Sequence, residues 1–509
     1  MSPKENKIRW WLAWIILALA TALQIWVWGF GSGIRQERFT GSVGFLLLTV
    51  LALLIWFFFL SRIRWTHRLW GLGSMVVMGV VFFNLVRVQG VNGDLVPILA
   101  WRWKSGLDEA PVAAARKASL SLVTDHAFPQ FLGRHRNATI PEVTLQTDWT
   151  STPPREVWRQ PVGEGWSGFA VVEDLAITLE QRGESEFVVA YDLGSGEIRW
   201  VHEDRARYST VVGGTGPRST PTIDGNVVFA TGATGILNAL DLRSGELKWK
   251  RDVLQENGSS VPDWGYSASP LVLGEQVIVT AGGKGKLLVA YDRNSSELVW
   301  SGGDDKIGYS SPTLMMLAGV SQIVSFNHSS ITSHDPENGQ VLWSHQWPSS
   351  QPNVMQPLQL PGDRVLASSG YGVGAKLFAV HSGSTEDLSV ELVWESPRLK
   401  SKFANSVYYQ GYVYGLDDGI LVCLDPETEQ RVWKQGRFGH GQVLLVGSHL
   451  LLQTEKGEMV LIDPNPEQLT ELARLRVFEG KTWNSPTLAG RFLLVRTARE
   501  AACYEMPVF

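Results

Sequence analysis

The sequence predicts an all-β domain, an eight-bladed β-propeller, preceded by three transmembrane α-helices. The first observation is a repeated pattern of eleven residues, which reads "AYDLGSGEIRW" at 190–200 and "ALDLRSGELKW" at 239–249. The second is the distance of about 45 residues between the tryptophans of successive copies. Repeats of about 40 to 50 residues with several short strands each are typical of propellers. The third is a set of long uncharged apolar segments near the N-terminus.

Three apolar segments have the length of membrane spans. Residues 10–30, 43–60 and 69–86 each run for 18 residues or more without a charge. A helix of about 20 apolar residues crosses the hydrocarbon layer of a membrane. The first segment could instead be a cleaved signal peptide, but it is long, and two further spans follow it. We therefore expect a three-helix anchor at 1–88.

The distribution of Lys and Arg predicts the orientation of this anchor. Three cationic residues precede the first span and three arginines lie in the loop 61–68, whereas the loop 31–41 carries two arginines and a glutamate. Short cytoplasmic loops are enriched in Lys and Arg, so the N-terminus is expected in the cytoplasm. If the cell is a diderm bacterium, this membrane is expected to be the inner membrane. A juxtamembrane connector at 89–152 and the propeller at 153–509 then lie on the periplasmic, extracytoplasmic side.

Each repeat reads as inner strands followed by a hairpin that ends in a tryptophan. In five copies an aspartate precedes the tryptophan by eight residues. The aspartate can accept hydrogen bonds from the backbone of the turn, and the turn glycine can adopt positive φ. The flat tryptophan on the outer strand can fill the wedge between neighbouring sheets. The predicted repeat positions are Asp192/Trp200, Asp241/Trp249, Asp292/Trp300, Asp335/Trp343 and Asp425/Trp433, with Trp394 in a unit that carries an irregular insert.

The repeats start out of phase, and this offset predicts how the ring closes. The last unit, from residue 482 onward, supplies three strands, while the segment 153–162 carries Trp158 with no inner strands before it. If 153–162 becomes the outer strand of the last unit, two open sheet edges disappear. The tract 153–509 then holds eight units.

The Asp-x-x-Thr/Ser-Gly-x-x-x-Trp pattern resembles the pyrroloquinoline quinone (PQQ)-like repeat. That family builds the eight-bladed propellers of quinoprotein dehydrogenases and of a lipoprotein component of the outer-membrane β-barrel assembly machine. A closer likeness, over "GDLVPILAWRW" (93–103), "FPQFLGRHRNATI" (128–140), 147–172 and "GYSSP" (308–312), is to membrane-anchored PQQ-like repeat proteins of planctomycetes. The resemblance covers about 70% of the chain. It implies the fold, and fold alone does not give function.

Residues just before each innermost strand are expected to ring one mouth of the propeller channel. A concave apolar mouth with a few polar groups is the usual form of a ligand site. The same positions could instead serve only to satisfy the backbone and to pack the loops. Phe403, Ser269 and Ser311 belong to this ring. The candidate ligand-binding residues are Trp166, Arg218, Trp264, Tyr266, Tyr309, Gln356, Lys402, Asn405, His440, Trp483 and Asn484.

One function that the resemblance implies is oxidation of an alcohol or sugar by PQQ with Ca²⁺. The planar quinone would lie on an aromatic floor such as Trp264 or Trp483, with Ca²⁺ on amide and carboxylate oxygens and a carboxylate as the base. The sequence departs from this. Alcohol and glucose quinoproteins are much longer than this tract, the adjacent Cys-Cys pair is absent, and no mouth motif places a carboxylate beside Asn405 or Asn484.

The other function is a scaffold that binds a protein or ligand of the cell envelope, by likeness to the assembly-machine lipoprotein. That lipoprotein is anchored by an N-terminal Cys, whereas the first Cys here is Cys423, so three spans would replace the lipid. The net charge of −5 shows no excess of basic residues of the kind that indicates nucleic-acid binding. Cys423 and Cys503 lie far apart and predict buried thiols. The sequence favours the scaffold, with no catalytic residue, metal site or cofactor assigned.

Overall fold

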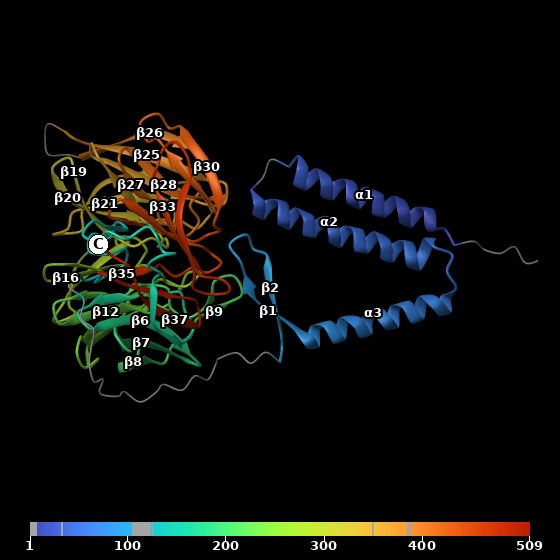
Figure 1. Cartoon of the computed structure of the whole chain (residues 1–509), viewed down its shortest axis with the longest axis horizontal. Helices are drawn as coiled ribbons and strands as arrows, with labels where there is room; N and C mark the ends of the chain where they lie inside the picture. The colour runs from blue at the N-terminus through green and yellow to red at the C-terminus, as the bar shows by residue number, and fades with distance from the viewer. Residues whose placement is uncertain (1–7, 32–33, 104–123, 125, 349–350, 384–387) are drawn as a thin grey trace, which may run out of the picture. The chain divides into compact units, whose positions relative to one another are not determined.

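The computed structural model describes residues 8–31, 34–103, 124, 126–348, 351–383 and 388–509. The chain divides into two compact units, Met1–Gly106 and Leu107–Phe509 (Figure 1). The first unit is helical with one hairpin, and the second consists almost entirely of β-strands.

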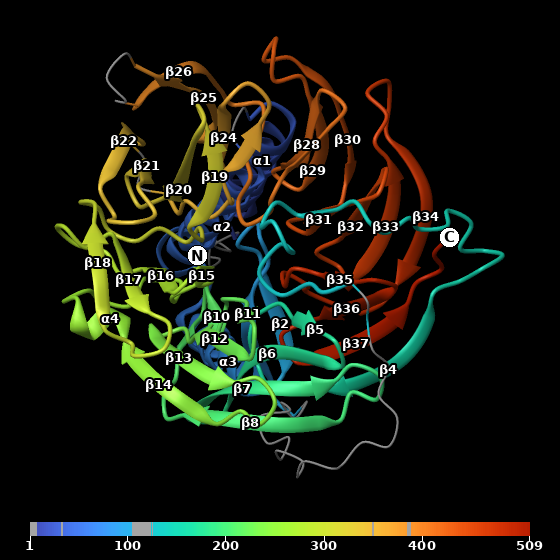
Figure 2. The same ribbon diagram turned by 90° about the vertical axis from the view of Figure 1, so that its left-hand side faces the viewer.

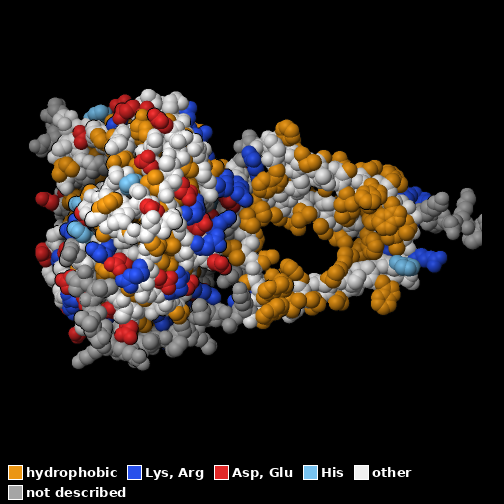
Figure 3. Space-filling model, in the orientation of Figure 1, with side chains coloured by type: hydrophobic (Ala, Val, Ile, Leu, Met, Phe, Trp, Pro, Cys, Tyr) orange, Lys and Arg blue, Asp and Glu red, His pale blue; other side chains and the backbone are white. Residues whose placement is uncertain are grey.

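Three helices of the first unit are long and apolar enough to cross a membrane, by length and composition. They are α1 (Trp10–Gly29), α2 (Arg35–Ile55), which continues as the π-helical turn η1 (Trp56–Leu60), and α3 (Trp65–Leu85). The second span begins at Arg35, eight residues before the predicted start at 43. Hydrophobic side chains cover these helices on the face in view, whereas charges of both signs are scattered over the propeller (Figure 3). The predicted apolar helices are therefore confirmed.

Polar groups at the ends of these helices are paired within the unit. Trp56 Nε1 donates to the carbonyl of Arg9 at 3.0 Å, and Arg9 N donates to the carbonyl of Ser61 at 3.1 Å. The hairpin of β1 (Val86–Val91) and β2 (Pro97–Trp101) follows α3. Its turn residue Asp94 forms an ion pair with Arg35 at 3.4 Å. Such pairing matters because unsatisfied backbone groups are costly in an apolar layer.

The second unit is built from antiparallel sheets that surround a common centre (Figure 2). Each sheet contains four strands that follow one another from an inner strand at the centre to an outer strand at the rim, and one sheet gains a fifth strand. The described residues form eight such sheets, named blades 1 to 8 in the order of their inner strands. This arrangement confirms the predicted β-propeller. Blades 1 to 4 consist of β5 (Ala170–Val172), β6 (Leu175–Arg182), β7 (Ser185–Asp192) and β8 (Ile198–Asp204); β11 (Thr222–Asp224), β12 (Val227–Thr231), β13 (Ile236–Asp241) and β14 (Leu247–Asp252); β15 (Leu271–Leu273), β16 (Gln276–Thr280), β17 (Leu288–Asp292) and β18 (Leu298–Gly302); and β19 (Thr313–Leu317), β20 (Val320–Phe326), β21 (Ser330–His334) and β22 (Val341–Gln346).

The remaining blades follow the same plan, with additions from the N-terminal part of the unit. A small hairpin, β9 (Ser209–Thr210) and β10 (Gly214–Thr215), joins blades 1 and 2, and a short helix α4 (Val253–Glu256) follows β14. Blades 5 to 8 consist of β23 (Leu358–Leu360), β24 (Arg364–Ser369), β25 (Gly374–Ser382) and β26 (Leu388–Ser396); β27 (Val407–Tyr409), β28 (Tyr412–Asp417), β29 (Ile420–Leu424) and β30 (Arg431–Arg437); β31 (Gln442–Val446), β32 (His449–Gln453), β33 (Glu458–Asp463) and β34 (Thr470–Arg476), with β3 (Thr139–Ile140) as a fifth strand; and β35 (Thr487–Ala489), β36 (Phe492–Arg496), β37 (Glu500–Glu505) and β4 (Arg155–Pro161).

The repeated aspartate shapes the turn between the third and the outer strand of a blade. Asp192 Oδ1 accepts hydrogen bonds from the N–H groups of Gly194 at 3.0 Å and Ser195 at 2.8 Å. These bonds fix the turn in the way that an aspartate side chain commonly does. The same pattern of two N–H donors recurs at Asp241, Asp292, Asp335 and Asp425.

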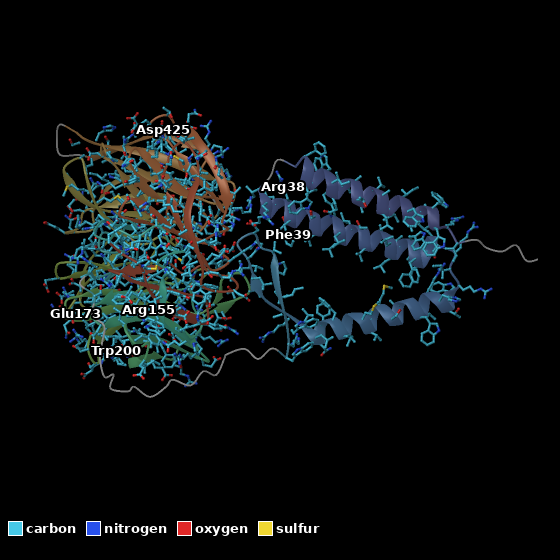
Figure 4. All side chains as sticks on the ribbon, viewed as in Figure 1. Arg38, Phe39, Arg155, Glu173, Trp200 and Asp425 are labelled. Carbon is cyan, nitrogen blue, oxygen red and sulfur yellow. The ribbon has the colours of Figure 1, made fainter. Side chains whose placement is uncertain are left out.

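The repeated tryptophan joins its blade to the next one. Trp200 Nε1 donates to the carbonyl of Leu242 in blade 2 at 2.9 Å, and the indole lies against Gly245 of the same turn. Trp343 differs, since its Nε1 donates to Gln322 Oε1 within its own blade. Figure 4 shows Trp200 and Asp425 at the outer edges of different blades. Bonds from the indole to the next blade are also made by Trp158, Trp249, Trp300, Trp394 and Trp433.

The ring closes through the strand that carries Trp158. β4 pairs with β37 in an antiparallel ladder that places Trp158 opposite Cys503 and Arg155 opposite Glu505 (Figure 2). The predicted closure, in which the N-terminal strand completes the last unit, is therefore confirmed. Joining the two ends of the domain in one sheet removes the open edges that each would otherwise present.

Residues 126–149, termed the arm, cross the centre of the ring and pack on several inner strands. They belong to the predicted connector segment 89–152. The hairpin β1–β2, which begins at Val86 within the predicted anchor 1–88 and continues into the connector, lies in the other unit. Backbone bonds tie the arm to blades 1, 2, 7 and 8, and β3 pairs in parallel with β31. Arg136 anchors the arm to blade 3, with its guanidinium donating to the carbonyls of Pro270 at 2.7 Å and Ser269 at 2.9 Å. The arm is therefore bonded to blades 1, 2, 3, 7 and 8.

Candidate functional site

Polar residues at the starts of the inner strands bond one blade to the next. Gly168 N donates to Thr220 Oγ1 at 3.3 Å, Thr220 N donates to Ser269 Oγ at 2.9 Å, and Ser269 N donates to Ser311 Oγ at 2.9 Å. These contacts run in order from blade 1 to blade 4. A hydroxyl at this position therefore satisfies a backbone donor of the preceding blade, as a buried N–H requires.

Amide side chains continue this series around the other half of the ring. Gln356 Nε2 donates to the Ser311 carbonyl at 2.6 Å, and Gln356 N donates to Asn405 Oδ1 at 2.9 Å. Gln442 Nε2 bonds the carbonyls of Phe403 at 2.8 Å and of residue 483 at 3.3 Å. Asn484 Nδ2 then donates to the carbonyl of residue 167 in blade 1 at 2.8 Å. This polar belt links all the blades, so its amides and hydroxyls hold the ring together.

An open pocket lies inside this belt. Its empty space, the open mouth included, amounts to about 860 Å³. The walls come from the segments that precede the inner strands of most blades, together with Phe131 of the arm. The lining residues are Phe131, Trp166, Gly168, Gly213, Arg218, Thr220, Trp264, Ser267, Tyr309, Ser311, Pro352, Val354, Phe403, Asn405, Gln442, Trp483 and Ser485.

Aromatic rings form a connected wall of this pocket. The centroids of Trp166 and Trp483 are 5.1 Å apart, those of Phe403 and Trp483 are 4.8 Å apart, and those of Trp264 and Phe403 are 6.2 Å apart. The Lys481 ammonium lies 3.9 Å from the Trp483 centroid and 4.6 Å from that of Trp166. Tilted rings at these separations attract one another, and a cation over an indole face is favourable.

Neighbouring loops fix the two indoles of this wall. Trp483 Nε1 donates to Glu455 Oε1 at 2.9 Å, and Trp166 Nε1 donates to the carbonyl of Gly213 at 3.0 Å. Gly213 belongs to the turn of the β9–β10 hairpin, which therefore positions Trp166. Both indoles are oriented by a hydrogen bond at one edge, which leaves their faces to the pocket and to Lys481.

Among the described residues, Arg218 is the one charged side chain in the pocket lining, whereas Lys481 and Glu455 both contact the indole of Trp483. Arg218 donates to the carbonyls of Gly213 at 2.6 Å and Gly214 at 3.2 Å and lies over the ring of Tyr208. Burial lowers the pKa of Arg218 to about 10. Burial also lowers the pKa of Lys481 to about 8, an effect that the charge of Glu455 opposes. As far as the described residues go, no Asp or Glu lines the pocket.

The structure brings six of the eleven predicted residues to the pocket wall: Trp166, Arg218, Trp264, Tyr309, Asn405 and Trp483. Tyr266 is turned into the core, where its hydroxyl donates to the Thr280 carbonyl at 2.9 Å. Gln356 and Asn484 lie in the polar belt. Lys402 and His440 are buried behind the wall, with Lys402 near the ring of Tyr371 and His440 near that of Phe403.

Three contributors to the site carried no usable signal in the repeat pattern. Phe131 comes from the arm, which lies outside the repeats. Gln442 is the first residue of β31, and its motif "FGHGQV" lacks the Ser/Thr-Pro start of other units. Lys481 stands two residues before Trp483, and this proximity to a predicted wall residue is the signal that could have identified it.

The lining does not fit a PQQ–Ca²⁺ pair. The aromatic wall suits a planar ring, but Ca²⁺ takes six to eight oxygen ligands, usually with carboxylates among them. The one amide oxygen of Asn405 already accepts a bond from Gln356 N, and the wall contributes no carboxylate among the residues described. The described residues of the whole chain also contain no group of three or more His, Cys, Asp or Glu side chains placed to hold a metal ion.

Comparisons with solved structures agree on the fold. The crystal structure of BamB from Moraxella catarrhalis is 18% identical, with a TM-score of 0.51, and the match covers 69% of this chain and 98% of that one. Quinohemoprotein alcohol dehydrogenase from Comamonas testosteroni is 13% identical, with a TM-score of 0.53, covering 74% of this chain and 80% of that one. At these identities the likeness concerns the fold alone. No curated protein matches the sequence significantly.

A family model gives the relationship in sequence. The model described as outer membrane protein assembly factor BamB matches residues 143–262 and 184–435, which together make up more than half of the chain. The match spans the arm end, the closing strand and the repeats of blades 1 to 6. This chain therefore belongs to the BamB-type family of PQQ-like repeat β-propellers.

Proposed function

We propose that the chain is a scaffold of the bacterial cell envelope, anchored by three helices in the inner membrane, whose extracytoplasmic propeller binds a protein or ligand at the aromatic pocket. The observation that carries this proposal is the wall of Trp166, Trp264, Phe403 and Trp483 around an open mouth without lining carboxylates. Tryptophan and tyrosine are the residues that most often dominate binding energy at interfaces.

The rim of the pocket supports a binding role because it is rigid. The polar belt ties each inner strand to its neighbour, and hydrogen bonds at Trp166 and Trp483 fix the two indoles. Rigid aromatic groups lose little conformational entropy on binding, so more of the contact energy appears as affinity. A loosely held mouth would lack this advantage.

Apolar side chains extend the binding surface beyond the pocket. The tip of the β9–β10 hairpin presents Val211, which is 67% exposed, and Val212, which is 38% exposed. The adjacent Gly213 lines the pocket and binds Trp166. The loop before Trp264 adds Val261, which is 39% exposed. Exposed apolar residues next to an aromatic pocket are typical of a protein-binding surface rather than of a closed catalytic chamber.

The alternative is PQQ-dependent oxidation, and the aromatic wall is the observation in its favour. The missing carboxylate ligands in the lining argue against it. Adding PQQ and Ca²⁺ to the full-length chain tests it directly. A stoichiometric change in quinone absorbance with dye reduction by alcohols or sugars would establish the oxidase and refute the scaffold proposal.

Site-specific photocrosslinking tests the scaffold proposal. A photoreactive amino acid at position 211 is expected to crosslink one discrete envelope protein or ligand in intact cells. Trp483→Ala should weaken this product at least fivefold, because it removes a wall of the pocket. A matched probe at position 298, an exposed leucine on the outer strand β18, should give no such product. Equal amounts of crosslinked product from the probes at positions 211 and 298, or an unchanged amount in Trp483→Ala, would refute the proposed site.

A reporter experiment tests the proposed orientation separately. Alkaline phosphatase fused after residue 509 should be active, because the enzyme requires the periplasm, while a fusion in the loop 61–64 should be inactive. The reverse pattern would place the propeller in the cytoplasm and refute an envelope role.

A further inference from the structure

A second groove lies beside the arm and shares no lining residue with the aromatic pocket. One wall is the arm itself, and the other is formed by the inner strands β15, β19, β23 and β27 of four successive blades. The lining residues are Gln130, Arg134, His135, Arg136, Asn137, Thr139, Leu271, Val272, Leu273, Thr313, Leu314, Met315, Pro357, Leu358, Gln359, Leu360, Pro361 and Tyr408.

The inner strands along this groove are sheet edges. Within the described residues, β19 and β23 are the last members of their sheets on the central side. In blade 7, which is next to blade 6, the arm shows how such an edge is used. Its strand β3 adds to β31 in parallel, with Thr139 opposite Leu445 and Ile140 opposite Val446. An extended segment can therefore be added to an inner strand at the centre of this propeller.

The strand β19 presents apolar side chains that the propeller does not cover. Leu314 is 39% exposed and Met316 is 57% exposed, while Met315 and Leu317 between and after them are buried. Alternate residues of a strand face opposite sides, so the exposed pair occupies one face. Large apolar side chains that are exposed on an innermost strand indicate a surface that a partner covers.

The opposite wall of the groove is polar and basic. Arg134 and His135 are exposed on the arm, and Arg136 beside them is buried on the carbonyls of blade 3. The lining as described contains no Asp or Glu. A segment in the groove would therefore meet apolar side chains along β19 on one side and a guanidinium on the other.

We propose that this groove binds an extended segment of a partner protein that carries an acidic side chain. The segment adds as a strand along β19 or β23, its apolar side chains cover Leu314 and Met316, and its carboxylate pairs with Arg134. Strand addition provides affinity through the backbone, and alternate side chains provide selectivity. The single charge contact contributes selectivity of about fivefold, as exposed ion pairs are weak.

A displayed library of random octapeptides, selected on the full-length chain in detergent, tests this proposal without assuming a sequence. Selection is expected to enrich peptides with alternating apolar residues and at least one Asp or Glu. A fluorescent version of the consensus should bind the wild type, and its Asp→Asn analogue should bind about fivefold more weakly. Arg134→Glu should abolish that preference, and Leu314→Asp should lower affinity at least tenfold.

Matched variants keep the test specific. Arg205→Glu reverses an exposed arginine outside the groove, and Leu298→Asp changes an exposed leucine on an outer strand. Both should bind the peptide as the wild type does, and thermal unfolding should show that Leu314→Asp folds. Trp483→Ala should also leave peptide binding unchanged, which separates this groove from the aromatic pocket.

The position of the peptide is checked by thiol protection. Both native cysteines are buried, so Leu314→Cys introduces one accessible thiol in the groove. Bound peptide should slow its alkylation at least fivefold. Failure to enrich a consensus, binding that ignores Arg134→Glu and Leu314→Asp, or an unprotected thiol would each overturn the proposal. Protection by phosphatidylglycerol vesicles with none by peptide would make the groove a lipid site and also overturn it.

Discussion

Trp158 lies directly across the β4–β37 ladder from Cys503, 345 residues later in the sequence. The same relationship occurs in blade 6, where Trp433 lies opposite Cys423. In both blades the thiol is buried beneath the outer strand that carries the tryptophan. The reactivity of each thiol therefore depends on whether its outer strand stays paired. For Cys503 that strand is β4, which comes from the start of the domain and closes the ring, and for Cys423 it is β30, which follows β29 directly.

Removing the closing indole should expose one thiol and spare the other. Trp158→Ala deletes a large buried side chain and its 2.8 Å bond to the Leu193 carbonyl, so β4 should separate more often from β37. Burial raises the pKa of both thiols, that of Cys423 to about 11, and keeps them unreactive. We expect Trp158→Ala to accelerate labelling of Cys503 at least tenfold, measured with a thiol reagent and peptide mass spectrometry.

The reciprocal variant is the control for this experiment. Trp433→Ala should accelerate labelling of Cys423 and leave Cys503 protected. Equal acceleration of both thiols in either variant would mean that the propeller opens as a whole, and that β4 has no special part in closing it.

The turn glycine of the motif is expected to tolerate no side chain. Gly245 has φ of +73°, and a Cβ there would lie 2.4 Å from Cε3 of Trp200. Gly245→Ala should therefore lower the free energy of unfolding by about 2–4 kcal/mol, the sum of backbone strain and overpacking. Gly225 also has positive φ, at +57°, but the nearest atom to its Cβ is 3.9 Å away. Gly225→Ala should cost only about 1–2 kcal/mol, and urea unfolding of both variants measures the difference.

The closure of the ring could be predicted from sequence because its signal is local. The spacing of aspartate and tryptophan records a turn and an outer strand, and a tryptophan strand without inner strands before it must be completed elsewhere. Trp158 carried this information by itself. The apolar helices could be predicted equally well, because the length and the lack of charge of a segment decide whether it can cross a membrane. Only the start of the second span differed, at Arg35.

The pocket could be predicted only in part because side-chain direction in loops leaves no periodic trace. Trp166 and Tyr266 occupy comparable loops before inner strands, yet one lines the pocket and the other turns inward to the Thr280 carbonyl. Gln356 was expected to face a ligand and instead bonds adjacent blades. Phe131 reaches the pocket through the path of the arm, which depends on contacts with distant blades.

Arg136 is expected to hold the arm in the centre of the propeller. Its guanidinium bonds two carbonyls of blade 3 and is buried, which lowers its pKa to about 9. Arg136→Met keeps the aliphatic stem but leaves the Ser269 carbonyl without its guanidinium donor, at about 1–3 kcal/mol for an unsatisfied group. The Pro270 carbonyl keeps its bond from Thr222 Oγ1 at 2.6 Å. The arm should loosen, and tryptic cleavage after Arg134 should be at least tenfold faster.

The control for this prediction is an arginine that makes a surface contact. Arg155, labelled in Figure 4, pairs with Glu505 across the closing ladder. Its side chain is 66% exposed. Because exposed ion pairs contribute little to stability, Arg155→Met should leave cleavage after Arg134 unchanged. Unchanged cleavage in Arg136→Met would show that the backbone bonds of the arm suffice without the guanidinium.

Glu186 should make the propeller less stable as the pH rises from about 4.5 to 7. Burial raises the pKa of this carboxyl to about 7 in the folded chain, although bonds from Ala233 N and the charge of Arg218 oppose the shift. The unfolded value is near 4.5, so in this window the folded state binds more protons than the unfolded state. Stability is therefore full below pH 4.5 and falls by up to about 3 kcal/mol by pH 7. Glu186→Gln should remove this loss, so the variant should gain on the wild type as the pH rises. Urea unfolding of both proteins at intervals from pH 4.5 to 8 measures the difference, and parallel curves would show that Glu186 is already ionised in the folded state.

The pKa of Glu505 is shifted in the opposite direction, because the hydrogen bond from Arg155 lowers it. Glu505→Gln should lower stability slightly above the unfolded pKa, where the wild-type carboxylate contributes, and this difference should disappear as the pH falls through the folded pKa.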